Sequence, residues 1–248
     1  MITNQWTWVY SIAVVVAVNV ALQMNPTTVA QAGSRIAEKT AASNIVRHVD
    51  TPKKLVALTF DDGPSETFTP QVLELLAKYH AKATFFVIGY RAKQYPQLLA
   101  RELADHHEIG NHTYSHVILT HKSEGRIRKE LLDGHNAIME SVGADESHYF
   151  RPPRGRFDKK VLQLARNEGY KIILWSVDSG DWSNPGATKV ARHVLAKVHS
   201  GDIVLFHDQG GNRTQTIDAL NQVIPALERQ GYHFVTLSEL MKSTEVQK

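Results

Sequence analysis

Short apolar runs alternate with helical patterns along the chain from Leu55 onward. The runs are rich in β-branched and aromatic residues, whereas the segments between them repeat apolar side chains at the three- and four-residue spacing of an amphipathic helix. This alternation is typical of βα units that build a parallel sheet. The strands predicted in this way are Leu55–Phe60, Ala83–Gly89, Glu108–Gly110, Tyr149–Phe150, Ile172–Val177, Asp202–Phe206 and His233–Leu237.

Proline and glycine mark the ends of the predicted helices. Thr69-Pro70 and Tyr95-Pro96 place proline at a helix start, where its missing N–H costs no hydrogen bond. Glycines suited to the left-handed conformation that ends a helix are Gly143, Gly169, Gly201 and Gly231. The seven predicted strands and their helices indicate a barrel-like or open α/β sheet, with the chemistry at the carboxyl ends of the strands.

The N-terminal segment differs in kind from the rest of the chain. Trp6 to Leu22 is almost entirely apolar and about long enough to cross a bilayer, and Ala30-Gln31-Ala32 carries the small residues that a signal peptidase recognises. We therefore predict a signal peptide or membrane anchor over residues 1–32, a linker over 33–53 and the functional domain over 54–248. The basic residues follow the apolar run, which argues against export, but a buried core helix does not explain the uncharged spacer after it. The predicted location is extracytoplasmic, secreted or membrane-anchored.

Composition narrows the function classes. A chain of 248 residues with 42% hydrophobic and 21% charged side chains is ordinary globular material. The formal net charge of +3 is too small and too scattered to indicate a nucleic-acid partner. The chain has no cysteine, which excludes disulfides and thiol catalysis, so any metal must be held by histidine and carboxylate.

Two neighbouring carboxylates, Asp61 and Asp62, stand where the first predicted strand breaks into the turn Asp-Asp-Gly-Pro. Adjacent carboxylates repel each other when both are ionised. The pair therefore indicates either a shared proton or a cation that one of them binds, with the other left free as a base. The alternative is a plain turn, because Asp, Gly and Pro are ordinary turn formers.

His112 and His116 follow the third predicted strand and lie four residues apart. They would share one face if a helical turn begins there. With Asp62 they form a set of two imidazoles and one carboxylate, which is typical of an open metal site with room for water and substrate and suits Zn²⁺ without being exclusive to it. Taken alone, the two could equally be surface histidines.

Three further polar groups follow predicted strands. Arg151 precedes two prolines that would hold it toward the strand ends. The segment from Asp178 to Trp182 combines two acids with an aromatic ring suited to a sugar face, and His207 ends a long apolar strand. Each group also has a purely structural explanation. Arg151 could belong to a polyproline turn, the segment from Asp178 to Trp182 could be an ordinary loop, and His207 could be a core histidine paired with Asp208.

Together the motifs resemble those of the polysaccharide deacetylases of carbohydrate esterase family 4, which share the NodB homology domain. The five motifs are Thr-Phe-Asp-Asp-Gly-Pro at 59–64, His-Thr-x-x-His at 112–116, Arg-Pro-Pro at 151–153, Asp-x-x-Asp-Trp at 178–182 and Leu-x-His at 205–207. The resemblance spans about Lys54 to Leu240. It implies a single catalytic domain with a distorted (β/α) barrel, usually seven-stranded, and a divalent metal ion. It also implies hydrolytic removal of acetyl groups from N-acetylated sugar polymers such as peptidoglycan or chitin.

The resemblance implies a role for each matching residue. Metal binding is implied for Asp62, His112 and His116. Catalytic roles are implied for Asp61 as general base, Arg151 as its orienting partner, His207 as general acid and Asp181 as the partner of that acid. An acetyl-binding pocket is implied for Leu205, Trp175 and Trp182. Zinc is the expected metal, with cobalt, nickel and manganese as alternatives.

One position departs from the family pattern. The third motif often carries tyrosine after its prolines, where this chain has Arg154. A second guanidinium there would favour an anionic glycan such as one bearing muramic acid carboxylates, so the expected substrate is peptidoglycan in preference to chitin. Membrane contact is expected only through the N-terminal segment, and the sequence gives no oligomeric state. Two other functions stay open: a barrel-type glycoside hydrolase that uses Asp61, Asp178 and Asp181, and a non-catalytic sugar-binding relative.

Overall fold

The computed structural model describes residues 44–143 and 147–244. The predicted signal peptide or anchor and most of the predicted linker lie outside these residues. Within the described ranges, no helix combines the length and apolarity needed to span a membrane.

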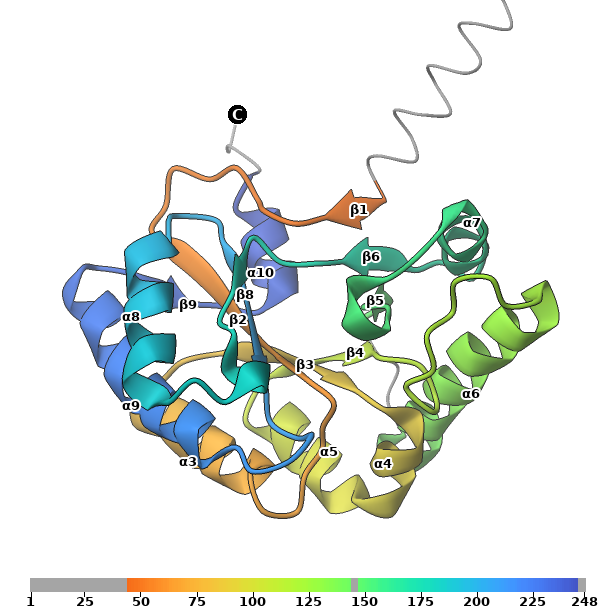
Figure 1. Ribbon diagram of the computed structural model, residues 1–248, viewed down its shortest axis with the longest axis horizontal. Helices are drawn as coiled ribbons and strands as arrows, with labels where there is room; N and C mark the ends of the chain where they lie inside the picture. Colours follow the sequence, from red (N-terminus) through yellow and green to blue (C-terminus); the bar gives the residue numbers. More distant parts are fainter. Residues whose placement is uncertain (1–43, 144–146, 245–248) are drawn as a thin grey trace, which may run out of the picture. The chain divides into compact units, whose positions relative to one another are not determined.

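One nine-stranded sheet forms the centre of the described domain (Figure 1). The strand order is β1-β6-β5-β4-β3-β2-β8-β7, with β9 paired to β2, and every pair is parallel. The bounds are β1 Ile45–Val46, β2 Leu55–Asp61, β3 Ala83–Val87, β4 Glu108–Asn111, β5 Tyr149–Phe150, β6 Lys171–Ile173, β7 Val177–Asp178, β8 Ile203–His207 and β9 His233–Phe234. The prediction of a parallel α/β sheet is confirmed.

The sheet curls into the expected distorted barrel. The predicted strand Ile172–Val177 is in fact two strands, because the chain between β6 and β7 leaves one side of the sheet and joins the other. Leu174 N–H bonds the carbonyl of Val46 beside β6 at 2.8 Å, whereas Ser176 N–H bonds the carbonyl of Ile203 on β8 at 3.1 Å. This split, together with the unpredicted β1, corrects the expected count of seven strands to nine.

Helices connect the strands and surround the sheet (Figure 1). Their bounds are α3 Thr69–Lys78, α4 Gly89–Gln94, α5 Pro96–Ala104, α6 Glu124–Val142, α7 Lys159–Asn167, α8 Ala187–Lys197, α9 Thr214–Arg229 and α10 Leu237–Lys242. Proline stands in the first turn of α3 and of α5, as predicted. Gly143 ends α6 in the left-handed conformation with φ 64°, which confirms the predicted cap.

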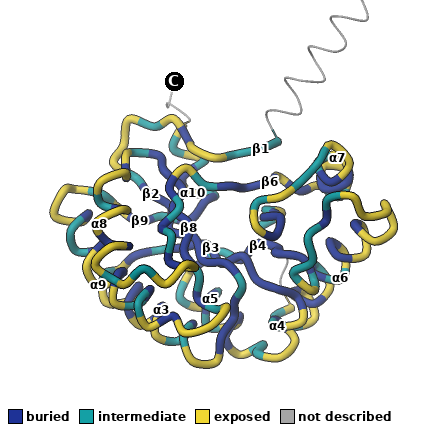
Figure 2. The backbone as a smooth tube through the Cα atoms, in the orientation of Figure 1, coloured by how far each residue is buried: buried dark blue, intermediate teal, exposed yellow. Residues whose placement is uncertain are grey.

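Strand β2 is buried on both faces and forms the centre of the core. Val56, Leu58 and Phe60 pack against the apolar sides of α3, α8 and α9, whereas the alternate residues Ala57 and Thr59 are buried on the opposite, inner face. Figure 2 shows the central strands as mostly buried and the helices as exposed along their outer sides. The alternation leaves the next inward residue, at the end of β2, to face the centre of the barrel.

Two predicted boundaries need correction. Residues 44–50 of the predicted linker belong to the domain, because β1 pairs with β6 and Val49 N–H bonds the carbonyl of Gly201 at 3.0 Å. The predicted strand His233–Leu237 ends at Phe234, because Thr236 and Glu239 form a capping box that starts α10. The described domain therefore includes residues 44–50, and its last strand ends earlier than predicted.

Candidate active site

A cavity of about 490 Å³ opens at the carboxyl ends of the strands. Parallel pairing brings residues far apart in sequence to this level: Asp61 at the end of β2 is the register partner of His207 at the end of β8. His112 follows β4 directly, and Arg151 follows β5. The cavity is lined by Asp61, Asp62, His112, His116, Arg154, Arg156, Trp175, Asp178, Trp182, Leu205, His207, Gly210 and Arg213.

The two carboxylates of the Asp-Asp-Gly-Pro turn both reach the cavity, although the backbone changes conformation between them. Asp61 is still in β2, whereas Asp62 has φ 74° in the left-handed region. Gly63 is required for a close approach, since a Cβ atom there would lie 2.5 Å from the carboxylate oxygens of Asp208. The turn is thus not a plain surface turn but part of a packed site.

The histidine motif is not a helical turn, which corrects the expectation for His112 and His116. Both Thr113 and His116 have left-handed backbones, with φ 68° and 57°, and His116 N–H bonds Thr113 Oγ1 at 2.9 Å. This tight loop returns the chain on itself, so the two imidazole rings still lie 5.0 Å apart between centroids. The predicted convergence holds although the predicted backbone was wrong.

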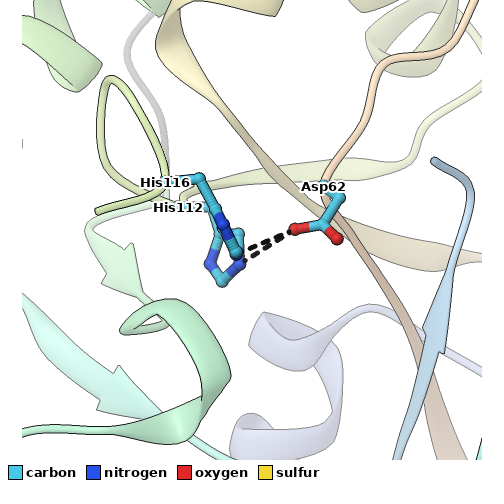
Figure 3. A group of neighbouring side chains, drawn as sticks. All are labelled: Asp62, His112 and His116. Atoms are coloured by element: carbon cyan, nitrogen blue, oxygen red, sulfur yellow. Dashed lines mark ion pairs between the residues drawn. The ribbon is translucent and has the colours of Figure 1, made fainter. Parts of the chain in front are cut away.

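Asp62, His112 and His116 form a cluster that fits a divalent metal ion (Figure 3). Asp62 Oδ1 lies 3.4 Å from His112 Nε2 and 3.1 Å from His116 Nε2, and one ligand atom from each residue lies within 4.8 Å of the others. Asp62 Oδ1 is buried without a hydrogen-bond partner among the described residues. His112 Nδ1 contacts the carbonyl of Arg151 at 2.7 Å, so Nδ1 carries the proton and Nε2 is free to act as a ligand.

The charge states of the cluster also suit a cation. Burial opposes ionisation of Asp62, but its contact with His112, together with the neighbouring His116 and His207, holds its pKa below the usual range. Burial and the neighbouring His112 lower the pKa of His116, which favours the neutral imidazole that binds metal. The donor set of two nitrogens and one oxygen is suited to zinc.

Asp61 is held beside this cluster by Arg151. Arg151 Nη1 donates to Asp61 Oδ1 at 2.7 Å and to Thr59 Oγ1 at 2.8 Å, and its guanidinium lies 4.1 Å from the centre of the Phe86 ring. Arg151 is fully buried, and its other donors bond the carbonyls of Ile173 and Leu174. These contacts fix Asp61 Oδ1, while Oδ2 lies 3.8 Å from the Nε2 atom of His112.

His207, at the end of the neighbouring strand β8, faces this pair, and Asp181 binds it from the short 3₁₀ turn Asp181–Ser183 after β7. His207 Nδ1 lies 2.8 Å from Asp181 Oδ1, and His207 N–H donates to Asp181 Oδ2 at 2.9 Å. Burial would lower the pKa of His207, but the hydrogen bond and charge of Asp181, with the charges of Asp61 and Asp62, raise it to about 9. The imidazole therefore carries a proton at neutral pH and can act as an acid.

The residues predicted to contact substrate also line the cavity, namely Arg154, Trp175, Trp182 and Leu205. Trp182 is 59% exposed, and its Nε1 donates to Asp178 Oδ1 at 3.3 Å, so the ring is held as an open platform. Gly155 packs against the ring of Trp175, where a Cβ atom would lie 2.9 Å away. The site thus combines polar reactive groups with aromatic walls suited to sugar rings.

Three cavity residues were not predicted: Arg156, Gly210 and Arg213. Arg156 stands two residues beyond Arg154, so its place beside the third motif could have been a signal. Arg213 is 4% exposed and bonds carbonyls of Gln209, Gly210 and Asp181. The contact with Asp181 joins residues 32 positions apart, and such a contact leaves no local pattern in the sequence.

The comparisons with known proteins agree with this geometry. Residues 48–173 match the family model described as polysaccharide deacetylase. A peptidoglycan-N-acetylglucosamine deacetylase from Bacillus cereus is 45% identical over 196 residues, which cover 78% of this chain and 91% of the relative. A chitooligosaccharide deacetylase from Sinorhizobium fredii is 40% identical over 187 residues, which cover 71% of this chain and 87% of the relative. The crystal structure of the Bc1960 peptidoglycan N-acetylglucosamine deacetylase has a TM-score of 0.77 at 34% identity and covers 81% of this chain and 94% of that one.

Fold and site together define a hydrolase that acts on amide bonds other than peptide bonds. The chain belongs to the polysaccharide deacetylase family, the NodB-like carbohydrate esterase family 4. This family is metal-dependent, and the cluster of Asp62, His112 and His116 is the metal-binding candidate among the described residues.

Proposed function

We propose that this protein is a zinc-dependent deacetylase that removes acetyl groups from N-acetylglucosamine-type residues of peptidoglycan and releases acetate. The observation that carries the proposal is the placement of Asp61. Arg151 binds one oxygen of its carboxylate at 2.7 Å, and the other oxygen lies beside the metal-binding candidate, 3.8 Å from His112 Nε2. A carboxylate fixed beside such a cluster, but not part of it, is placed to act as a general base.

Asp61 takes the proton of the water that attacks the acetyl carbonyl. Arg151 keeps the carboxylate oriented, so that Oδ2 can accept this proton. When bound at Asp62, His112 and His116, a divalent cation polarises the carbonyl and lowers the pKa of water from ~15.7 toward ~7. Zinc is favoured for this role, with cobalt, nickel and manganese as alternatives.

His207 serves the second half of the reaction. Asp181 holds the imidazole at Nδ1, so the Nε2 proton passes to the sugar nitrogen as the carbon–nitrogen bond breaks. The bonding electron pair leaves with nitrogen, which gives a free amine and acetate. A matched acid and base each supply a rate factor of ~10²–10⁴. The main-chain N–H of Arg154 is our candidate donor to the oxyanion, and removal of one such donor costs about 2.7–4 kcal/mol in other hydrolases.

Peptidoglycan is favoured over chitin by two considerations. A relative named for peptidoglycan deacetylation is 45% identical to this chain, although a chitooligosaccharide deacetylase is 40% identical. Arg154 lines the cavity with an exposed side chain, where a guanidinium suits a glycan with carboxylate substituents.

Replacement of Arg154 by alanine should lower the rate on peptidoglycan relative to a neutral chitooligosaccharide. An exposed charge pair contributes about 0.2–1 kcal/mol, so we expect the ratio of kcat/KM values to fall by up to about fivefold. Arg166→Ala, which removes an exposed guanidinium on α7 outside the cavity, is the matched control. An unchanged ratio in Arg154→Ala would show that this guanidinium does not select the polymer.

Acetate release by the purified full chain tests the function itself. We expect release from peptidoglycan and, more slowly, from chitooligosaccharides when Zn²⁺ is present. A glycoside hydrolase would instead produce new reducing ends, and a sugar-binding relative would produce neither. The structure disfavours the glycosidase alternative, because Asp181 is fully buried against His207 and Asp178 is engaged by Trp182 and Gly180. Reducing ends without acetate would refute the proposal.

We further propose that the protein acts outside the cytoplasm, secreted or anchored by its N-terminal segment. The cell-wall substrate is found there, and the apolar run from Trp6 to Leu22 with the small residues around Ala32 supports export. Fractionation of cells that express the tagged full chain tests this location, and recovery in the cytoplasm alone would contradict it.

A further inference from the structure

The first turn of α9 holds the loop that carries Asp181. Gln215 Nε2 donates to the carbonyl oxygen of Asp181 at 2.7 Å, and Arg213 Nη1 donates to the same oxygen at 3.3 Å. Arg213 also bonds the carbonyls of Gln209 and Gly210, which follow β8. The backbone of Asp181 is therefore fixed to the helix start and to the segment beyond His207.

Thr216, in the same turn, reaches the carboxylate of Asp181. Its side chain is fully buried, and Oγ1 donates to Asp181 Oδ2 at 2.9 Å. That oxygen also accepts the N–H of His207 at 2.9 Å, while Oδ1 faces His207 Nδ1 at 2.8 Å. Both oxygens of the carboxylate are thus held, and Thr216 supplies the side-chain donor on the oxygen that the imidazole does not use.

The hydroxyl of Thr216 is used in an unusual direction for its position. In the first turn of a helix, threonine commonly bonds nearby backbone groups. Here it bonds a carboxylate 35 residues away. Packing alone does not require the hydroxyl, because valine has the same branched shape and would fill the same buried space. A hydroxyl at this position has a use beyond volume.

We propose that Thr216 is a positioning residue for the general acid His207, acting through Asp181. This inference rests on the proposed function, since it gives His207 the task of protonating the leaving nitrogen. Thr216 fixes the plane of the Asp181 carboxylate, which fixes the imidazole and aims its Nε2 proton into the cavity. Without the hydroxyl, Oδ2 keeps only the backbone donor, and the carboxylate can rotate away from His207 Nδ1.

The test compares two substrates whose leaving groups differ in their need for a proton, which separates general-acid catalysis from the other steps of the reaction. An N-acetylated sugar needs a proton on its departing nitrogen, whereas 4-nitrophenyl acetate releases a phenolate that departs without one. In the Zn²⁺-loaded full-length protein, Thr216→Val should lower kcat for acetate release from chitopentaose about tenfold. This loss is smaller than the whole rate factor of ~10²–10⁴ that a general acid supplies, because His207 itself is still present. KM should stay unchanged, and hydrolysis of 4-nitrophenyl acetate should stay within about twofold of wild type.

Two control variants are measured beside Thr216→Val. Thr216→Ser keeps the hydroxyl and should restore the rate on the glycan. Thr214→Val makes the same substitution at an exposed threonine of the same turn and should match wild type. The rate on 4-nitrophenyl acetate reports whether each variant is folded and loaded, and Thr216→Ala provides a second deletion of the hydroxyl if the valine variant does not fold.

The outcomes distinguish the inference from the function on which it rests. Equal rates for Thr216→Val and wild type on the glycan would overturn the role of Thr216, as would an equal loss on glycan and ester. Failure of Thr216→Ser to restore the glycan rate would also overturn it. Absence of acetate release by the wild-type enzyme, seen before any substitution, would overturn the proposed function and this role together.

Discussion

Replacement of Asp61 by asparagine should reduce acetate release on the order of 10³-fold and leave the zinc content of the protein near normal. The amide cannot take the proton of the attacking water. It does keep the shape of the side chain, and its oxygen can still accept the hydrogen bond that Arg151 Nη1 makes to Asp61 Oδ1 at 2.7 Å. The metal-binding candidate does not include Asp61, so zinc should still bind. Acetate release and zinc per chain by elemental analysis are the two measurements.

The buried guanidinium of Arg151 gives this variant a second signature. Loss of the negative partner of a buried ion pair destabilises a protein by about 3–5 kcal/mol when the remaining charge has no other contacts. Arg151 keeps its bonds to Thr59 and to two carbonyls, so a smaller decrease in Tm is expected. Asp178→Asn, which removes a carboxylate from the same cavity, should cost less than about tenfold in rate, because Asp178 bonds Trp182 and the N–H of Gly180 and takes no part in the proposed proton transfers. An Asp61→Asn variant that is folded, zinc-loaded and active would contradict the role of Asp61.

Much of the fold follows from patterns that the sequence carries locally. Apolar runs of strand length, proline at helix starts and Gly143 at a helix end correspond to elements of the structure. The predicted strand across Thr236 and Glu239 was wrong because these residues form a capping box, whose Thr-x-x-Glu signature the sequence also carries. A local helix-start signal thus outweighs the apolar pattern at this position.

Other parts of the fold depend on contacts between distant segments and leave no local signal. Ile45–Val46 is a strand only because β6 lies beside it. The run from Ile172 to Val177 is apolar except for Ser176, yet it contains two strands because Leu174 and Ser176 bond partners on different sides of the sheet. In both cases hydrogen bonds to distant segments decide which residues form a strand, and strand propensities of single residues do not predict such bonds.

The candidate site shows the same division. The motifs predicted which side chains converge, because strands in a parallel sheet all end at one edge. The route of the backbone was not predictable: His116 reaches Asp62 through left-handed residues and not through a helical turn. The supporting residues Arg213 and Thr216 lie more than 30 residues from Asp181, and only the fold brings them together.

Replacement of Asp62 by asparagine should remove both the metal and the activity. A neutral amide is a weaker ligand than a carboxylate, and loss of a direct ligand should lower the zinc affinity at least about 100-fold, since substitutions that only support a ligand already cost ~10–100-fold. In the wild-type protein, dialysis against a chelator should abolish acetate release, and Zn²⁺ should restore it. In Asp62→Asn, added Zn²⁺ should restore little. Isothermal titration of the metal-free proteins measures the affinities.

Stability provides an independent readout of the same prediction. A ligand at 100 times its Kd stabilises the folded state by about 2.7 kcal/mol, so Zn²⁺ should raise the Tm of the wild-type protein and of Asp61→Asn but not that of Asp62→Asn. A Zn²⁺-dependent rise in Tm that survives in Asp62→Asn would place the metal elsewhere.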